Sequence, residues 1–349
     1  MLKSDPVDVL GLDNQAETAS GADIEPPMLA VCGLTVEFAA MSGPPITAVR
    51  DFDLSIQRGE IFGLVGESGA GKTTLARALL RLPPEPGRIA GGAIQLDGQD
   101  LMALNDVELQ RIRGRDLSMI VPNPRAELNP LLSVGEQIAT MAAVHLRLPR
   151  REARRMALDM LRAVQIPDPE RRMGAFPHEM SGGMAQRIVI AIALICSPKF
   201  IVSDDATSGL DVTVQAQVLE LLRRLVLDRG SAMLFITRDI GIAAHFCDRV
   251  AVMYDGEVLE LAAREDFFFR PCHPYTVMLM AAFSHNPRLR RMWSRPEILP
   301  DTTRPGAAAG ACRYVARCPL AQERCRAERP ALRELAPGHF ARCHFPVRR

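Results

Sequence analysis

The sequence predicts an α/β fold with a helical insertion and a small Cys-rich carboxy-terminal extension. Strand-like alternation over residues 29–65, and strands alternating with helices over residues 199–261, indicate an α/β core that we place at residues 28–265. A strongly helical stretch at about residues 125–197 interrupts this core. After the core the composition becomes rich in Pro, Arg and Cys, so residues 266–349 are predicted to form a separate extension.

Composition excludes several classes of protein. The chain has 349 residues and a formal net charge of +1, which gives no signal of nucleic-acid binding. Residues 1–27 carry six acidic residues against one lysine, so we expect a disordered acidic tail. No apolar run approaches the length of roughly 18 residues typical of a membrane span, and no signal peptide is evident. We therefore expect a cytosolic protein that is soluble by itself and keeps its cysteines reduced.

A glycine-rich loop fixes the expected ligand. The segment Gly66-Glu67-Ser68-Gly69-Ala70-Gly71-Lys72-Thr73 lies between an apolar strand, 61–65, and a helix that continues from Thr74. Glycines let successive N–H groups point at phosphates, and the helix N-terminus adds partial positive charge. Lys72 would reach the β- and γ-phosphates and Thr73 would hold Mg²⁺. The alternative is a turn without a ligand. The expected phosphate-binding residues are Gly66, Ser68, Gly69, Gly71, Lys72, Thr73 and Thr74.

Two carboxylates follow a second apolar strand. Phe200-Ile201-Val202-Ser203 leads directly into Asp204 and Asp205. Asp204 is the candidate on the metal side, and Asp205 is the candidate that orients or deprotonates the attacking water. An acidic pair in an ordinary turn is the alternative, because two carboxylates alone are a weak signal.

A third motif indicates the family. Met180-Ser181-Gly182-Gly183-Met184-Ala185-Gln186-Arg187 precedes a long apolar helix, and here the sequence resembles the ATP-binding subunits of ABC transporters. The resemblance implies an ABC-type P-loop NTPase core that binds ATP and Mg²⁺. It also implies that Ser181, Gly182 and Gly183 bind the γ-phosphate of ATP held by an opposite subunit, that Asp211 belongs to a D-loop, and that Phe38 stacks on adenine.

Further segments narrow the resemblance. Pro177-His178-Glu179, the run 210–217 and His273-Pro274-Tyr275-Thr276 look like the oligopeptide, dipeptide and nickel importer subfamily. That likeness implies a heterodimer with a second ABC ATPase subunit, two transmembrane permease subunits and an extracytoplasmic solute-binding protein. It places the chain peripherally on the cytoplasmic face of the inner membrane. The solute stays open among dipeptides, longer peptides, nickel chelates and glutathione-like compounds.

Three positions depart from the family pattern. Pro122 replaces a glutamine and has neither a side-chain amide nor an N–H. Asp205 replaces the catalytic glutamate and is one methylene shorter. Arg238 replaces a histidine, and a guanidinium cannot shuttle a proton, although it can bind phosphate or pair with Asp205. We expect a site that binds ATP but hydrolyses it poorly, unless a neighbour such as Asn123 supplies the missing amide.

Two other functions compete with transport. A soluble ABC protein acting on ribosomes or DNA would usually carry two cores or long heptad runs, and this chain has one core without sustained heptads. A regulatory pseudo-ATPase would merge with the transport hypothesis if the partner subunit hydrolyses ATP.

Four cysteines cluster near the end of the chain. Cys312, Cys318, Cys325 and Cys343 are separated by five, six and seventeen residues. Zinc is the generic interpretation, but the paired Cys-x-x-Cys spacing of common zinc modules is missing; four ordinary buried thiols are the alternative to any metal site. The segment resembles the tail of peptide-importer ATPases that carry a [4Fe-4S] cluster. Arginines adjacent in sequence would then offset the charge of an anionic cluster: Arg313, Arg317, Arg324, Arg326 and Arg342.

Overall fold

The computed structural model describes residues 25–40, 42–283 and 310–347. The acidic tail predicted at residues 1–27 lies almost wholly outside these ranges. Within them, no helix combines the length and the apolar character needed to cross a membrane.

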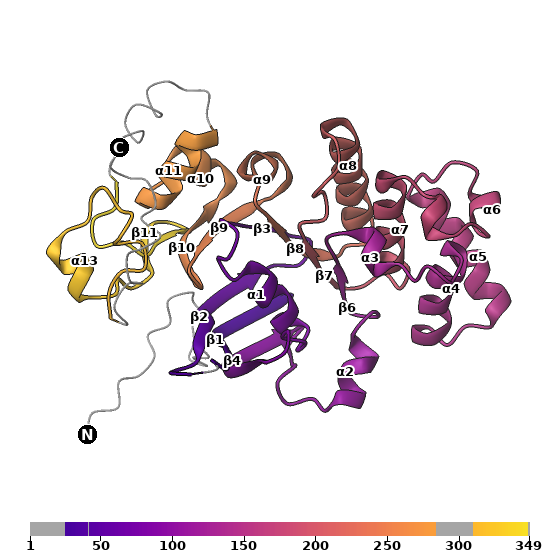
Figure 1. The fold of residues 1–349 in the computed structure, drawn as a ribbon, viewed down its shortest axis with the longest axis horizontal. Coiled ribbons are helices and arrows are strands. Elements are labelled where there is room, and N and C mark those ends of the chain that lie inside the picture. Colours follow the sequence, from indigo (N-terminus) through magenta and orange to yellow (C-terminus); the bar gives the residue numbers. More distant parts are fainter. Residues whose placement is uncertain (1–24, 41, 284–309, 348–349) are drawn as a thin grey trace.

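An eight-stranded sheet runs through the middle of the molecule (Figure 1), in the order β11-β12-β10-β9-β3-β8-β7-β6. The strands from β9 to β6 are parallel to one another, and the three at the other edge pair antiparallel. The strands are β3 (Ile61–Val65), β6 (Leu117–Ile120), β7 (Phe200–Asp204), β8 (Ala232–Thr237), β9 (Arg249–Tyr254), β10 (Glu257–Ala263), β11 (Arg333–Ala336) and β12 (His339–Ala341).

A second sheet and one helix cover one face of the central sheet. This antiparallel sheet has the order β2-β1-β4-β5. Helix α1 (Lys72–Leu79) lies between the two sheets (Figure 1), and all three contribute to one apolar cluster. The strands are β1 (Leu29–Phe38), β2 (Ile46–Ile56), β4 (Gly87–Leu96) and β5 (Gln99–Asp100).

The central strands are buried on both faces. In β3, Phe62 and Leu64 belong to the cluster shared with α1, whereas Ile61 and Val65 belong to a separate cluster on the other face. Successive side chains of a strand point to opposite faces, so an all-apolar run fits a strand covered on both sides. Helices α8 (Val212–Asp228) and α9 (Ile240–Phe246) are among those that contribute to this second cluster.

The helical insertion is confirmed between β6 and β7. Ser133 and Ser181 cap the starts of two of its helices by accepting hydrogen bonds from main-chain N–H groups, as N-cap serines commonly do. The insertion projects from one end of the molecule (Figure 1). Its helices are α3 (Pro124–Glu127), α4 (Val134–His145), α5 (Arg150–Ala163), α6 (Pro169–Arg172) and α7 (Gly182–Leu194); the short helix α2 (Asp106–Ile112) precedes β6.

The carboxy-terminal extension is not a separate unit, in contrast to the prediction from composition. Strand β12 pairs with β10, with Ala341 opposite Glu260 and Phe340 opposite Leu261, so the hairpin β11–β12 continues the central sheet. The predicted boundary after residue 265 falls inside a helix. The helices here are α10 (Arg264–Phe269), α11 (Pro274–Phe283) and α13 (Glu323–Ala327).

A buried carboxylate ties the extension to the core. Glu257 in β10 is 1% exposed and forms ion pairs with four arginines. Its Oε1 lies 2.9 Å from Arg329 Nε, 3.6 Å from Arg313 Nε and 3.7 Å from Arg50 Nε, and its Oε2 lies 3.9 Å from Arg342 Nε. Three of these arginines come from the extension, so one negative charge holds much of it in place.

We expect Glu257→Gln to destabilise the protein by about 3 kcal/mol, because it leaves partly buried cations without their shared counterion. The thermal unfolding midpoint of the full chain should fall. Glu328→Gln is the matched control, since Glu328 forms an exposed pair with Arg324 in the same extension and such pairs contribute little. Equal midpoints for the two variants would contradict the tethering role.

Candidate functional site

The glycine-rich loop joins β3 to α1 as predicted, and crowding explains two of its glycines. A Cβ on Gly66 would lie 2.3 Å from the Met253 carbonyl oxygen, and one on Gly71 would lie 2.3 Å from that of Ala48. Gly71 also has a φ of 101°, in the left-handed region that favours glycine. Both positions therefore require glycine.

Lys72 bends back over the loop that precedes it. Its Nζ donates hydrogen bonds to the carbonyl oxygens of Gly66 (2.8 Å) and Glu67 (2.7 Å). Burial lowers the pKa of Lys72, while the nearby carboxylates of Asp204 and Asp205 raise it. The ammonium group is thus held beside the loop and close to the acidic pair.

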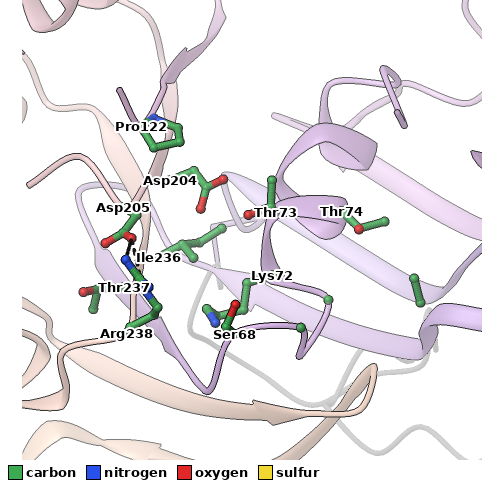
Figure 2. Close-up of a pocket in the computed structure, with 13 residues that line it drawn as sticks. Ser68, Lys72, Thr73, Thr74, Pro122, Asp204, Asp205, Ile236, Thr237 and Arg238 are labelled. Atoms are coloured by element: carbon green, nitrogen blue, oxygen red, sulfur yellow. Dashed lines mark hydrogen bonds and ion pairs between the residues drawn. The ribbon is translucent and has the colours of Figure 1, made fainter. Parts of the chain in front are cut away.

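Thr73 and Asp204 form a corner suited to a hard cation. Asp204 ends β7 and is 2% exposed, and burial raises its pKa although a hydrogen bond with Thr73 lowers it. Figure 2 shows the two side chains pointing toward each other. Among the described residues, no group donates a hydrogen bond to Asp204 Oδ2, although this oxygen is buried. A buried carboxylate oxygen without a donor fits Mg²⁺, which prefers oxygen ligands.

A cavity of about 310 Å³ brings the predicted segments together (Figure 2). Four parallel strands end around this cavity. The phosphate loop, the acidic pair, Pro122 and Arg238 therefore meet at one edge of the sheet. The lining residues are Ala48, Ser68, Gly69, Gly71, Lys72, Thr73, Thr74, Pro122, Asp204, Asp205, Ile236, Thr237 and Arg238.

Arg238 is paired with Asp205. Its Nε donates to Asp205 Oδ2 at 3.1 Å, a terminal nitrogen lies 2.9 Å from the same oxygen, and Ser208 Oγ accepts a further hydrogen bond at 3.3 Å. Asp205 has a left-handed φ of 48°. The carboxylate expected to act on water is therefore bound by a cation that cannot accept a proton.

Pro122 lines the same cavity and offers no hydrogen-bonding group to it apart from a carbonyl. Asn123, which the sequence suggested as a substitute amide, does not line the cavity and is exposed. The structure gives no sign of the compensation.

Three other predicted elements lie away from the cavity. Ser181 is exposed at the start of α7 and accepts a hydrogen bond from the Met184 N–H (3.3 Å), while Asp211 caps α8 through the Val214 N–H (3.0 Å). Phe38 is half-buried beside Gly87 and packs on the cluster shared with α1. Their contacts with ATP, like those of Gly182 and Gly183, stay predictions.

Several residues of the site lie outside the motifs recognised in the sequence. Ile236 and Thr237 end β8, beside the acidic strand, and the rule that parallel strands end together would have found them. Ala48 approaches the loop through its carbonyl, for which the sequence gives no signal. Tyr275 and Arg317 contact Glu67 in the loop from the carboxy-terminal region.

The four clustered cysteines line one small cavity of roughly 10 Å³. All four are free thiols, and the N–H of Cys312 donates to the carbonyl of Cys325 (2.9 Å). Although all four belong to the described residues, no three of their sulfur atoms lie within 4.8 Å of one another. Burial raises the pKa of Cys343 to about 11 and that of Cys318 to about 12.

Several arginines near these cysteines are engaged elsewhere. Arg313 and Arg342 pair with Glu257, Arg317 pairs with Glu67, and Arg324 pairs with Glu328. These four arginines already pair with carboxylates, so they are less available to offset the charge of a cluster than their positions in the sequence suggested.

A separate group of possible ligands has another explanation. Donor atoms of Glu260, Cys272 and His339 lie within 4.8 Å of one another. However, Glu260 Oε1 accepts the Cys272 N–H (2.7 Å) and lies 2.7 Å from His339 Nε2, so the group is an internal ion pair. Burial opposes the charged form, but hydrogen bonds with Cys272 and Glu260 raise the pKa of His339 to about 10.

Comparisons with known proteins agree with this geometry. The profile of the ABC transporter family matches residues 49–208, and the profile described as "Oligopeptide/dipeptide transporter, C-terminal region" matches residues 259–325. The dipeptide transport ATP-binding protein DppD of Escherichia coli is 38% identical, over 92% of this chain and 97% of that protein. The oligopeptide transport ATP-binding protein OppD of Salmonella typhimurium is 40% identical, over 92% and 94% respectively.

A probable peptide ABC transporter ATP-binding protein of Sinorhizobium fredii, y4tR, is 42% identical over 85% of this chain and 88% of its own length. Among solved structures, the dimeric post-hydrolysis state of the ATP-binding cassette MJ0796, bound to ADP and Pi, is similar. It has a TM-score of 0.61 and 28% identity, and the match covers 68% of this chain and 99% of that one.

We expect Lys72→Ala to weaken ATP binding by the full chain about 10- to 100-fold, the usual effect of losing a hydrogen bond to a charged group. Titration with a fluorescent ATP analogue measures this. Lys199→Ala is the control, because Lys199 is a surface cation that pairs with Asp97. Unchanged affinity in Lys72→Ala would show that the loop does not bind the phosphates.

Proposed function

The chain belongs to the ABC transporter family as an ATP-binding subunit of a peptide importer, and we propose that its own ATP site is impaired in hydrolysis. In this proposal the chain binds MgATP at its phosphate loop and supplies Ser181, Gly182 and Gly183 to the ATP of a partner subunit. It thereby acts in solute import mainly through binding and assembly.

The observation that carries the proposal is the contrast within one cavity. Lys72, Thr73 and Asp204, the groups that would hold phosphates and Mg²⁺, are in place. The groups that would activate water are altered: Pro122 lacks an amide, and Asp205 is paired with Arg238. Binding and turnover rest on different groups, so one can persist without the other.

The position of the Ser181 loop supports a shared site. Ser181 is exposed and lies outside the chain's own cavity, so its loop is available to a second subunit. A helix N-terminus with free N–H groups suits a phosphate oxygen. The similar cassette MJ0796 is described as dimeric. We propose a heterodimer with a second ATPase subunit whose own catalytic groups are intact.

The membrane partners follow from the family. We propose that the pair docks beneath two transmembrane permease subunits, on the cytoplasmic face of the inner membrane, and that an extracytoplasmic solute-binding protein delivers the solute. The names of the relatives favour a dipeptide or an oligopeptide.

The four cysteines are proposed to hold a [4Fe-4S] cluster in a structural role. A single tetrahedral zinc, with Zn–S distances near 2.3 Å, needs sulfur atoms about 3.8 Å apart. No three of these sulfurs lie within 4.8 Å of one another, which is too far apart for that zinc geometry, although all four cysteines line one cavity.

We expect Asp205→Asn to leave the ATPase rate of the assembled transporter nearly unchanged, because Asp205 contributes little turnover. Ser181→Arg should abolish the rate, since it places bulk and charge where the partner's γ-phosphate docks. Ser197→Arg, the same change beyond the other end of α7, is the control for Ser181→Arg.

Asp205→Asn and Ser181→Arg must both be measured with the same partner subunit and with assembly confirmed. Loss of a water-activating group typically costs about a hundredfold or more in rate. A loss of that size in Asp205→Asn would make this chain the hydrolytic subunit and overturn the proposal.

For the cysteine site, we expect anaerobically purified protein to contain iron and acid-labile sulfide, and Cys318→Ser to lose both. Elemental and sulfide analysis distinguishes an iron–sulfur cluster from a zinc site. Stoichiometric zinc without iron would exclude the cluster, and Cys196→Ser, which removes a buried thiol outside this cavity, serves as the control.

A further inference from the structure

The phosphate loop is held from the far end of the chain. Both terminal nitrogens of Arg317 donate to the carboxylate of Glu67, at 2.8 Å to Oε2 and 3.0 Å to Oε1. Glu67 is the second residue of the phosphate loop, whereas Arg317 lies directly before Cys318 in the extension. Two parallel hydrogen bonds of this kind fix both the position and the orientation of the Glu67 carboxylate relative to Arg317.

A second contact reaches the same loop residue. The N–H of Glu67 donates to the hydroxyl oxygen of Tyr275 at 3.2 Å. Tyr275 is oriented at the start of α11 by its own N–H, which donates to Nδ1 of the buried His273 at 3.0 Å. Two different segments of the carboxy-terminal region therefore form hydrogen bonds with the same residue of the loop.

An aromatic cluster joins these contacts to the cysteine cavity. The rings of Tyr254, Tyr275 and Tyr314 pack with centroids 4.9 to 5.4 Å apart, and the Arg317 guanidinium lies 5.6 Å from the Tyr254 ring centroid. Tyr314 also lines the cavity of the four cysteines. Packed contacts thus run without a break from that cavity to the phosphate loop.

The charge of Glu67 gives the contact a consequence for binding. A carboxylate within a phosphate loop repels the nucleotide unless a cation offsets it. The Glu67 side chain is 39% exposed and that of Arg317 is 23% exposed, so solvent screens this repulsion only in part. In addition, the Glu67 carbonyl oxygen accepts a hydrogen bond from Lys72 Nζ, so the orientation of Glu67 also affects the position of the lysine.

We propose that Arg317 is a positioning residue of the nucleotide site, which neutralises Glu67 and fixes the phosphate loop for ATP. The inference rests on the proposed binding of ATP by this loop. It assigns to the extension a direct role in nucleotide affinity, in addition to its place in the sheet.

If Arg317 acts by neutralising Glu67, the substitution Glu67→Gln should suppress the effect of Arg317→Gln. Arg317→Gln leaves the Glu67 carboxylate without its counterion, so the affinity for ATP should fall about fivefold, the scale of a partly exposed ion pair. Glu67→Gln in the same chain removes the uncompensated charge, so the double variant should bind ATP nearly as tightly as the wild type. The loss in Arg317→Gln should also shrink as ionic strength rises.

The test is titration of the full-length chain and its variants with a fluorescent ATP analogue, with the iron, zinc and sulfide content determined for each preparation. Arg324→Gln is the matched control, because Arg324 forms an exposed pair with Glu328 in the same extension and contacts no phosphate-loop residue among those described. It should bind ATP like the wild type, and all variants should have equal metal and sulfide content.

Two results would overturn the inference. One is unchanged affinity in Arg317→Gln. The other is a double variant as weak as Arg317→Gln alone, which would mean that Arg317 acts only by holding the extension together. A wild-type chain that binds no ATP would instead refute the proposed function, so the two failures are distinguishable.

Discussion

The chemistry of this protein depends on the parallel pairing of β3, β8, β7 and β6. Their in-register ladders bring four strand ends to one edge of the sheet, where Val65 leads into the phosphate loop and Ile120 leads toward Pro122. A one-residue slip would turn every side chain of a strand to the opposite face. Because each strand is apolar on both faces, the packed clusters resist such a slip, and the cavity is fixed by the core rather than by its own polar contacts.

The sequence predicted the features whose cause is local. The phosphate loop, the acidic pair at Asp204 and the helical insertion each follow from short patterns, and the parallel-strand rule explains why the first two meet. The pairing of β12 with β10, the grip of Arg317 on Glu67 and the four arginines around Glu257 depend on contacts between distant segments. Arginine density around the cysteines indicated charge compensation for a cluster, whereas the folded chain commits most of those arginines to carboxylates.

The pair between Arg238 and Asp205 is weak by itself. The Arg238 side chain is 58% exposed and that of Asp205 is 23% exposed, so the pair contributes at most about 1 kcal/mol. In the proposed ATP-bound state, the γ-phosphate would compete with Asp205 for the Arg238 guanidinium. Arg238 would then stabilise bound ATP, yet it would still be unable to accept a proton. In either position the arginine is consistent with the proposed retention of ATP, because a guanidinium cannot accept a proton from water.

The extension contacts the phosphate-loop side of the cavity. Arg317 and Tyr275 contact Glu67 in the phosphate loop, on the side of Lys72, and none of their described contacts reaches Pro122, Asp205 or Arg238. Contacts that position the phosphate loop are those that the proposed retention of ATP would need, because this loop would bind the phosphates.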